Sequence, residues 1–465
     1  METTIIDRAL GSGIPYVVYA TPFFFLFIGI EWVVGWLERR RLYRMNDSIN
    51  DLSCGIMQQI IGLFMRGGMF LGYVAIYERF HLLDVASFSP AGKWVAAGVL
   101  FLGVDLAYYW FHRIAHEMNA PWAAHVVHHQ SEEYNLSVAL RQGTFQGVFS
   151  WIFYVPLVVI GFPPLWLVAV MAFDTLYQFW IHTRAIDRLG PLEWLFNTPS
   201  HHRVHHARNP KYLDKNYAGT LIIWDRMFGT FTAEQEEPVY GLTKPLNSWN
   251  PLWANLHVWY ELVRDAYLAP KWKDKLKIWF MPPGWRPDGL PPSPHGAEVS
   301  REIVISYDTV IPRGLTLYVF VQFVLTLVVS TAVLRMADRY SGILLVGLAA
   351  WIVWSLTNFG GVYERRRWAI ASELLRLATS AIGCVAYIGG LVPSNAFAFD
   401  ARWAFATTAM VGLSGVWLLA YVREFSGVAT YYHGRPPGLI RAAGQDAEPT
   451  EAWSVAPAPG LVAKR

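Results

Sequence analysis

Histidines occur in two short stretches of this chain with the spacing of metal ligands. The first stretch contains His-x3-His and then His-x2-His-His, and the second contains His-x2-His-His with one further histidine directly before it. Residues three and four positions apart share a helix face, so each stretch directs several imidazoles the same way. Imidazole is the commonest metal ligand among side chains. The nine residues are His112, His116, His125, His128, His129, His201, His202, His205 and His206.

The number of histidines distinguishes between kinds of metal site. A zinc protease carries His-Glu-x-x-His on one helix, whereas here Glu117 follows His116 and lies outside the pair. One zinc takes three or four protein ligands, and haem takes one or two axial histidines, so both would leave most of the set unused. Two metal ions with about four histidines each would use the eight residues of the repeated pattern. Nitrogen ligands with open positions suit iron and oxygen chemistry.

The elements that must position these residues are membrane-spanning helices. The chain of 465 residues is 54% hydrophobic and only 16% charged, whereas soluble proteins carry roughly 25% charged residues. A spanning helix needs about 20 mostly apolar residues. A glycine followed by two prolines interrupts one long apolar stretch at 161–164, which predicts a helical hairpin. Apolar stretches of suitable length cover residues 14–37, 52–77, 94–111, 147–181, 315–334, 342–357, 373–392 and 403–422.

We therefore predict an all-α polytopic membrane protein whose helical cap carries the histidine site. Residues 1–300 would form the membrane-embedded catalytic domain, and residues 301–433 further transmembrane helices without chemistry that we can recognise. Residues 434–465 are rich in Pro, Ala and Gly, which predicts a disordered tail. The net charge of +3 gives no reason to expect nucleic acid as a partner.

Basic loops predict the orientation in the membrane. Arginines cluster at 39–41, after the first span, and at 365–367, before the penultimate span. Short cytoplasmic loops carry an excess of Lys and Arg, so we place both clusters in the cytoplasm. The third span then delivers His112 and His116 to the cytoplasmic face, and the hairpin returns to that face. Both histidine stretches therefore meet in one compartment, on the inner membrane of a bacterium or the endoplasmic reticulum of a eukaryote.

The histidine motifs and their flanking residues resemble those of a known family. The stretches that carry the resemblance are HRIAHEMNAPWAAHVVHH, YQFWIHT and NTPSHHRVHHARNPKYLDKNYAGT, within about residues 30–290. They are similar to the fatty acid hydroxylase/sterol desaturase superfamily, and most to its alkylglycerol monooxygenase-like branch. The resemblance implies a di-iron centre that activates dioxygen. Its implied ligands are His112, His116, His125, His128, His129, His202, His205 and His206, with His182 as a further ligand and His201 outside the set.

Two carboxylates near the motifs are candidates for catalytic roles. Enzymes of the resembling family also carry His-Glu, so Glu117 could orient a ligand through its free ring nitrogen; a salt bridge on the helix surface is the alternative. Asp105 lies two helical turns before His112 and inside the span. A carboxylate within a membrane is a functional candidate by default. We expect Asp105 to bond a histidine or to close the floor of the site.

The resemblance implies that a lipid from the bilayer is oxidised with O2. In the alkylglycerol branch the carbon beside the ether oxygen is hydroxylated, and the hemiacetal collapses to a fatty aldehyde and a glycerol. That branch draws electrons from tetrahydrobiopterin. We see no flavin or cytochrome b5 domain in the sequence, so a free pterin or a separate redox protein would serve as the external electron donor. The superfamily offers hydroxylation or desaturation of a sterol or acyl chain as the alternative.

A protein of a different class would use the same histidines to bind a transported metal. A transporter needs polar or charged residues along its spans, and the last four spans carry few charges. The histidines also lie at the edge of the membrane rather than within it. These features make a metal-binding transporter the weakest of the functions considered.

Overall fold

The computed structural model describes residues 16–290, 304–389, 401–426 and 430–435. In this part of the chain six helices are long and apolar enough to cross a membrane. Three belong to the N-terminal half, namely α2 (Tyr16–Leu37), α3 (Met45–Phe80) and α4 (Pro90–Glu117). The other three are α13 (Arg313–Arg335), α14 (Gly342–Tyr363) and α15 (Arg367–Ile388). The predicted helical membrane protein is therefore confirmed.

Shorter apolar helices complete both halves. The predicted hairpin is formed by α7 (Gln146–Ile160) and α8 (Pro164–Trp180), and α16 (Ala401–Leu419) pairs with α15. Gly161 makes the hairpin turn at a φ of 122°, where a side chain would also meet the Leu83 carbonyl oxygen at 2.0 Å. Only glycine adopts this conformation without strain, and Pro164 then starts α8 at a position where it loses no helical hydrogen bond.

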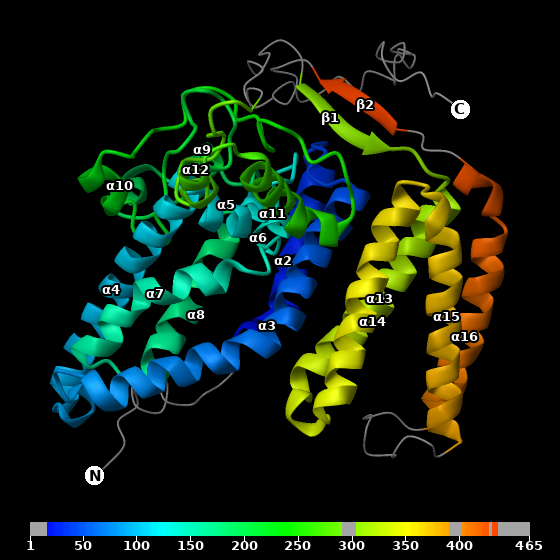
Figure 1. The fold of residues 1–465 in the computed structure, drawn as a ribbon, viewed down its shortest axis with the longest axis horizontal. Helices are drawn as coiled ribbons and strands as arrows, with labels where there is room; N and C mark the ends of the chain where they lie inside the picture. The colour runs from blue at the N-terminus through cyan, green and yellow to red at the C-terminus, as the bar shows by residue number, and fades with distance from the viewer. Residues whose placement is uncertain (1–15, 291–303, 390–400, 427–429, 436–465) are drawn as a thin grey trace.

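The cap lies at one end of the spanning helices (Figure 1). Apart from α11 (Pro251–Leu268), its helices are short, and long loops join them. Hydrogen bonds to the loop backbone hold these loops in place. The short helices are α5 (Asn119–His125), α6 (Leu136–Ala139), α9 (Pro199–His205), α10 (Ile223–Phe228) and α12 (Trp272–Lys277). One 3-10 turn, η2 (Val126–His129), continues α5.

The C-terminal helices are attached to the catalytic half at two levels. Within the spans, Met57 and Ile60 of α3 belong to one apolar core with Leu315, Val319 and Phe359. At the cap, strand β1 (Val304–Thr309) pairs antiparallel with β2 (Thr430–Arg435), which is the one departure from an all-α fold in the described residues. The rest of the predicted tail, residues 436–465, lies outside the described residues.

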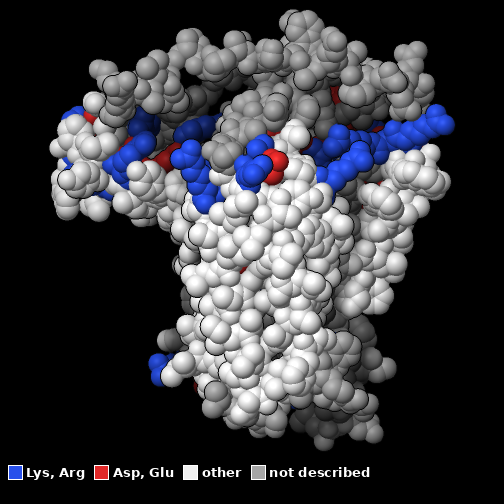
Figure 2. Space-filling model, turned by 90° about the vertical axis from the view of Figure 1, so that its right-hand side faces the viewer, with Lys and Arg blue, Asp and Glu red and all other residues white. Residues whose placement is uncertain are grey.

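Figure 2 shows Lys and Arg gathered in a belt near one end of a largely uncharged surface. The two basic loops belong to this end of the molecule. Arg40 donates to the Arg184 carbonyl at 2.7 Å, and Arg365 donates to the Glu424 carbonyl at 2.7 Å. The predicted arrangement, in which both basic loops and both histidine stretches share one end of the bundle, is present in the structure.

Candidate metal centre

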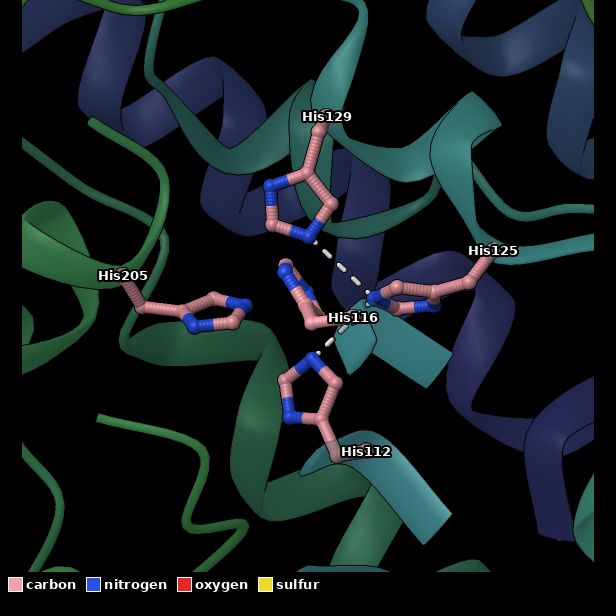
Figure 3. A group of neighbouring side chains, drawn as sticks. All are labelled: His112, His116, His125, His129 and His205. Carbon is pink, nitrogen blue, oxygen red and sulfur yellow. Dashed lines mark hydrogen bonds between the residues drawn. The ribbon is translucent and has the colours of Figure 1, made fainter. Parts of the chain in front are cut away.

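The histidines of the two stretches converge on two neighbouring points in the cap. In each group the nitrogens available as ligands all lie within 4.8 Å of one another. Figure 3 shows the first group, whose imidazoles point toward one another from α4, from the α5–η2 segment and from α9. The first group contains His112, His116, His125, His129 and His205, and the second contains His128, His182, His202 and His206.

Distances between ring nitrogens fit metal coordination. In the first group, His125 Nε2 lies 3.0 Å from His112 Nε2 and 3.1 Å from His129 Nε2. In the second group, His182 Nε2 lies 3.2 Å from His128 Nε2 and 3.0 Å from His202 Nε2. Two imidazoles at right angles on one metal, with bonds of about 2.1 Å, place their nitrogens about 3.0 Å apart. The residues present therefore fit one metal ion in each group.

Two buried nitrogens of the first group support this reading. His116 Nε2 and His205 Nε2 are buried and have no hydrogen-bond partner. A buried polar atom without a partner costs about 1–3 kcal/mol. A metal ion at the centre of the group would satisfy both atoms.

The far side of most imidazoles is held by an oxygen acceptor. A histidine that donates from Nδ1 is fixed as the tautomer whose Nε2 is free to bind a metal. Four of the acceptors are backbone carbonyls, and one is a glutamine side chain. These contacts are His112 to Tyr217 O at 2.8 Å, His125 to Gln146 Oε1 at 2.8 Å, His128 to Arg141 O at 2.8 Å, His182 to Gln178 O at 2.7 Å and His205 to Lys215 O at 3.0 Å.

Burial favours the neutral form of several imidazoles in the cap by lowering their pKa. It lowers the pKa of His125 to about 3, and it lowers the pKa of His129 and His202 well below the ordinary value. Neighbouring histidines lower the pKa of His129 and His202 further, since two positive charges would lie in contact. A metal binds only the neutral form of imidazole, so the folded chain presents its histidines in the state that coordination requires.

The paired histidines of each motif are divided between the groups. His128 and His129 are adjacent in sequence, yet one belongs to each group, and the same holds for His205 and His206. The ring centroids of His129 and His206 lie 4.5 Å apart across the boundary. Each His-His pair therefore joins the two metal positions side by side.

Asp105 lies beneath the first group and holds a loop rather than a histidine. Its fully buried carboxylate accepts hydrogen bonds from Thr220 N at 2.7 Å, Leu221 N at 3.0 Å and Trp224 Nε1 at 2.8 Å. Asp225 fixes the same loop by accepting from the backbone N–H of Tyr217 at 2.8 Å. The Tyr217 carbonyl in turn accepts from His112. Asp105 thus reaches the site through the loop that orients His112.

Two other residues singled out in the sequence point away from the metal positions. Glu117 forms an ion pair with Arg113 at 2.9 Å on the surface of α4, and its side chain is 43% exposed, as in the salt-bridge alternative. His201 is buried outside both groups, with its Nε2 4.0 Å from Glu193. His182, from the end of the hairpin, lies in the second group with the motif residues.

Arg141 organises the backbone around the second motif. Its buried guanidinium donates to Val127 O at 2.7 Å, to Gln130 at 2.6 Å and to Asp51 of α3 at 3.1 Å. Its own carbonyl accepts from His128. These contacts make Arg141 a tie between loops. Gln146 and Tyr217 were not identified, because a carbonyl or amide acceptor leaves no distinctive pattern in a sequence.

Two family models match this chain. The model described as fatty acid hydroxylase matches residues 97–230, which contain all nine grouped histidines. The model described as the alkylglycerol monooxygenase C-terminal domain matches residues 315–401, which contain most of α13 and all of α14 and α15. No solved structure matches the chain.

Curated relatives cover most of the chain. An alkylglycerol monooxygenase of Homo sapiens is 40% identical over 391 residues, which are 83% of this chain and 86% of the relative. One of Danio rerio is 41% identical over the same shares of the two chains. An ornithine lipid hydroxylase of Rhizobium tropici is 34% identical over 146 residues, which are 30% of this chain and 43% of the relative.

Proposed function

The chain belongs to the alkylglycerol monooxygenase family, and we propose that it cleaves the ether bond of alkylglycerols with O2 and an external reductant. It is an oxygen-dependent oxidoreductase of membrane lipids, with the fatty acid hydroxylase motifs in its cap. The observation that carries the proposal is the division of nine histidines into two adjoining metal-binding groups within the matched domain.

We propose two iron ions as the metals. When bound, they would supply activation of O2 for the hydroxylation of a C–H bond. His112, His116, His125, His129 and His205 would hold one ion, and His128, His182, His202 and His206 the other. Sites made only of neutral nitrogen ligands leave the ions cationic and accessible to O2. The buried cap keeps water and stray reductants away from them.

The reaction balances when one reductant molecule supplies two electrons. One oxygen atom of O2 enters the C–H bond beside the ether oxygen as a hydroxyl group, and the other leaves as water after uptake of two electrons and two protons. The product is a hemiacetal, which collapses to a fatty aldehyde and a glycerol. Tetrahydrobiopterin is the proposed reductant, because it gives up two electrons and two protons on oxidation to a dihydropterin.

The substrate would reach the site from the bilayer. The helix that carries His112 is apolar over most of its length, and Leu100 and Val104 are fully buried below the site. On the membrane-facing surface, Val95, Val99 and Leu102 of the same helix are exposed. A lipid chain can therefore remain in apolar surroundings while its headgroup end approaches the cap.

We place the cap on the cytoplasmic side, in the inner membrane of a bacterium or the endoplasmic reticulum of a eukaryote. The argument is the belt of Lys and Arg at the cap end of the helices (Figure 2). Positive residues flanking spans favour the cytoplasmic side. The placement also gives the site access to a soluble reductant.

The proposed activity is tested with purified protein in detergent or nanodiscs. The protein is incubated with a 1-O-alkylglycerol, a sterol or a fatty acyl lipid, each with O2 and tetrahydrobiopterin. We expect fatty aldehyde from the alkylglycerol alone. If the ether stays intact and the sterol or acyl chain is hydroxylated or desaturated, the protein instead has the alternative activity of the superfamily.

A further inference from the structure

The cap contains a cavity of about 310 Å³ whose lining includes residues of α9 but none of the nine grouped histidines. Ser200 and His201 line this cavity and directly precede the ligand His202 on the same helix. The mechanism above does not use the cavity. His201 therefore has a defined location, although it belongs to neither metal group.

Flat side chains form part of the lining. The Arg226 guanidinium lies 3.9 Å from the centre of the Phe231 ring, and the His201 ring meets Phe231 edge-on with centroids 5.3 Å apart. Trp194 also lines the cavity, and 78% of its surface is exposed. Aromatic rings and guanidinium planes bind planar ligands by stacking.

Polar groups of opposite kinds complete the lining. Glu193 uses Oε1 to accept from Ser200 at 2.7 Å and from Leu189 N at 3.0 Å, whereas its Oε2 lies 4.0 Å from His201 Nε2, beyond hydrogen-bond distance. A carboxylate oxygen suits a ligand that carries N–H donors, and the arginines of the lining, Arg188 and Arg226, suit carbonyl or ring-nitrogen acceptors.

The position of the cavity matches the need for an outside reductant, if the proposed function holds. Ether cleavage with O2 consumes two electrons that the histidine-bound metals do not themselves replenish. The lining residues Arg188, Arg226 and Trp194 are exposed on the cap, so a water-soluble molecule can reach them without entering the bilayer. The lipid substrate would approach the metals from the spans instead.

We propose that this cavity binds the reductant, a planar reduced nitrogen heterocycle of the tetrahydropterin class. Glu193 Oε2 accepts from the N–H edge of the ring system, and Trp194 and Phe231 flank its faces. The ligand is oxidised by two electrons and two protons to the dihydropterin, and these electrons and protons reduce one atom of O2 to water.

The proposal is tested by direct binding as well as by kinetics. Binding of tetrahydrobiopterin to the purified protein is measured anaerobically by calorimetry, without lipid. Glu193→Gln should raise Kd by about 10- to 100-fold, since one charge-assisted hydrogen bond is lost. Trp194→Ala should weaken binding several-fold. Because Trp194 is exposed, its loss should not unfold the protein, so weaker binding would report on the cavity itself. Glu237→Gln, an exposed cap residue outside the cavity, is the matched control and should leave Kd unchanged.

Kinetics separate this site from the lipid site. In both cavity variants the KM for tetrahydrobiopterin should rise, while the KM for alkylglycerol and the iron content stay at the control values. Unchanged Kd in both variants would overturn the cavity assignment. If aldehyde forms only with a different donor, such as a reduced flavoprotein, the cavity proposal fails and the proposed function stands. If no donor supports aldehyde formation, the proposed function fails.

Discussion

Replacement of Asp105 tests whether this carboxylate positions the metal centre or takes part in the reaction. In the structure it accepts three hydrogen bonds, two from the backbone of the loop at Thr220 and Leu221 and one from Trp224 of α10. Asp105→Ala leaves two buried backbone donors and the half-buried Trp224 Nε1 without a partner. At about 1 to 1.5 kcal/mol for each, the free energy of unfolding should fall by about 3 to 5 kcal/mol.

The substitution should also weaken metal binding, because the loop connects Asp105 to the metal centre. The loop places the Tyr217 carbonyl that fixes the ring of His112, so a displaced loop releases one ligand of the first group. Loss of an outer partner of a metal ligand typically lowers metal affinity about 10- to 100-fold. Asp105→Asn keeps one carbonyl oxygen as an acceptor and should lie between Ala and the wild type.

Two measurements on the same samples distinguish the roles. Thermal unfolding in detergent reports stability, and elemental analysis after dialysis against a weak chelator reports bound iron. Asp338→Asn, at the exposed turn between α13 and α14, is the control. If Asp105→Ala retains wild-type stability and iron but loses turnover, Asp105 acts in the chemistry and the positioning argument is refuted.

Three further substitutions test other parts of the structure. His182→Ala should reduce bound iron from about two to about one per chain, because the second group falls to three ligands; unchanged iron would remove His182 from the site. Gly143→Ala should lower stability by about 1 to 3 kcal/mol and disturb the first histidine stretch at His125–His129, because the new Cβ would lie 1.9 Å from the Ala124 carbonyl oxygen; wild-type melting and iron would contradict this packing. Glu373→Ala should lower the stability of the C-terminal helices by about 3 to 5 kcal/mol, since it leaves Arg376 as a buried unpaired charge, with iron content unchanged; a melting curve like that of the wild type would contradict the buried ion pair.

Hydropathy was sufficient to locate the spans but not their full lengths. The span predicted at 52–77 belongs to the longer helix α3, whose first turns carry buried polar residues such as Asp47 and Asp51. These carboxylates are stabilised by Ser131 and Arg141 from distant parts of the chain. A hydropathy window ends at such residues, because it includes no tertiary partners.

The histidine motifs predicted the kind of site, but not its division into two groups. Spacing along a helix places His112 and His116 on one face, and both belong to the first group. Spacing does not show that neighbours such as His205 and His206 serve different metals. That division depends on how α9, which carries the second stretch, docks against the first stretch, and this docking is a property of tertiary packing.

The C-terminal helices show even more clearly that tertiary contacts cannot be predicted from sequence patterns. Their sequence appeared to lack chemistry, yet Glu373 and Arg376 form a buried ion pair with Tyr318, Gln322 and Asn358 around it. Each of these residues is isolated in an apolar stretch when the sequence is considered alone. Polar side chains that bond across membrane helices fix which helices pair, so the network defines the packing of this half.

Oxygen labelling tests the central claim most directly, namely that this chain cleaves an ether by oxygenation at its histidine-bound metals. The iron-loaded protein is given a 1-O-alkylglycerol and reductant under ¹⁸O2, and the aldehyde is trapped at once by reduction to the alcohol. We predict one ¹⁸O atom in the fatty alcohol and none in the released glycerol. Unlabelled alcohol, or label in the glycerol, would contradict hydroxylation of the carbon beside the ether oxygen.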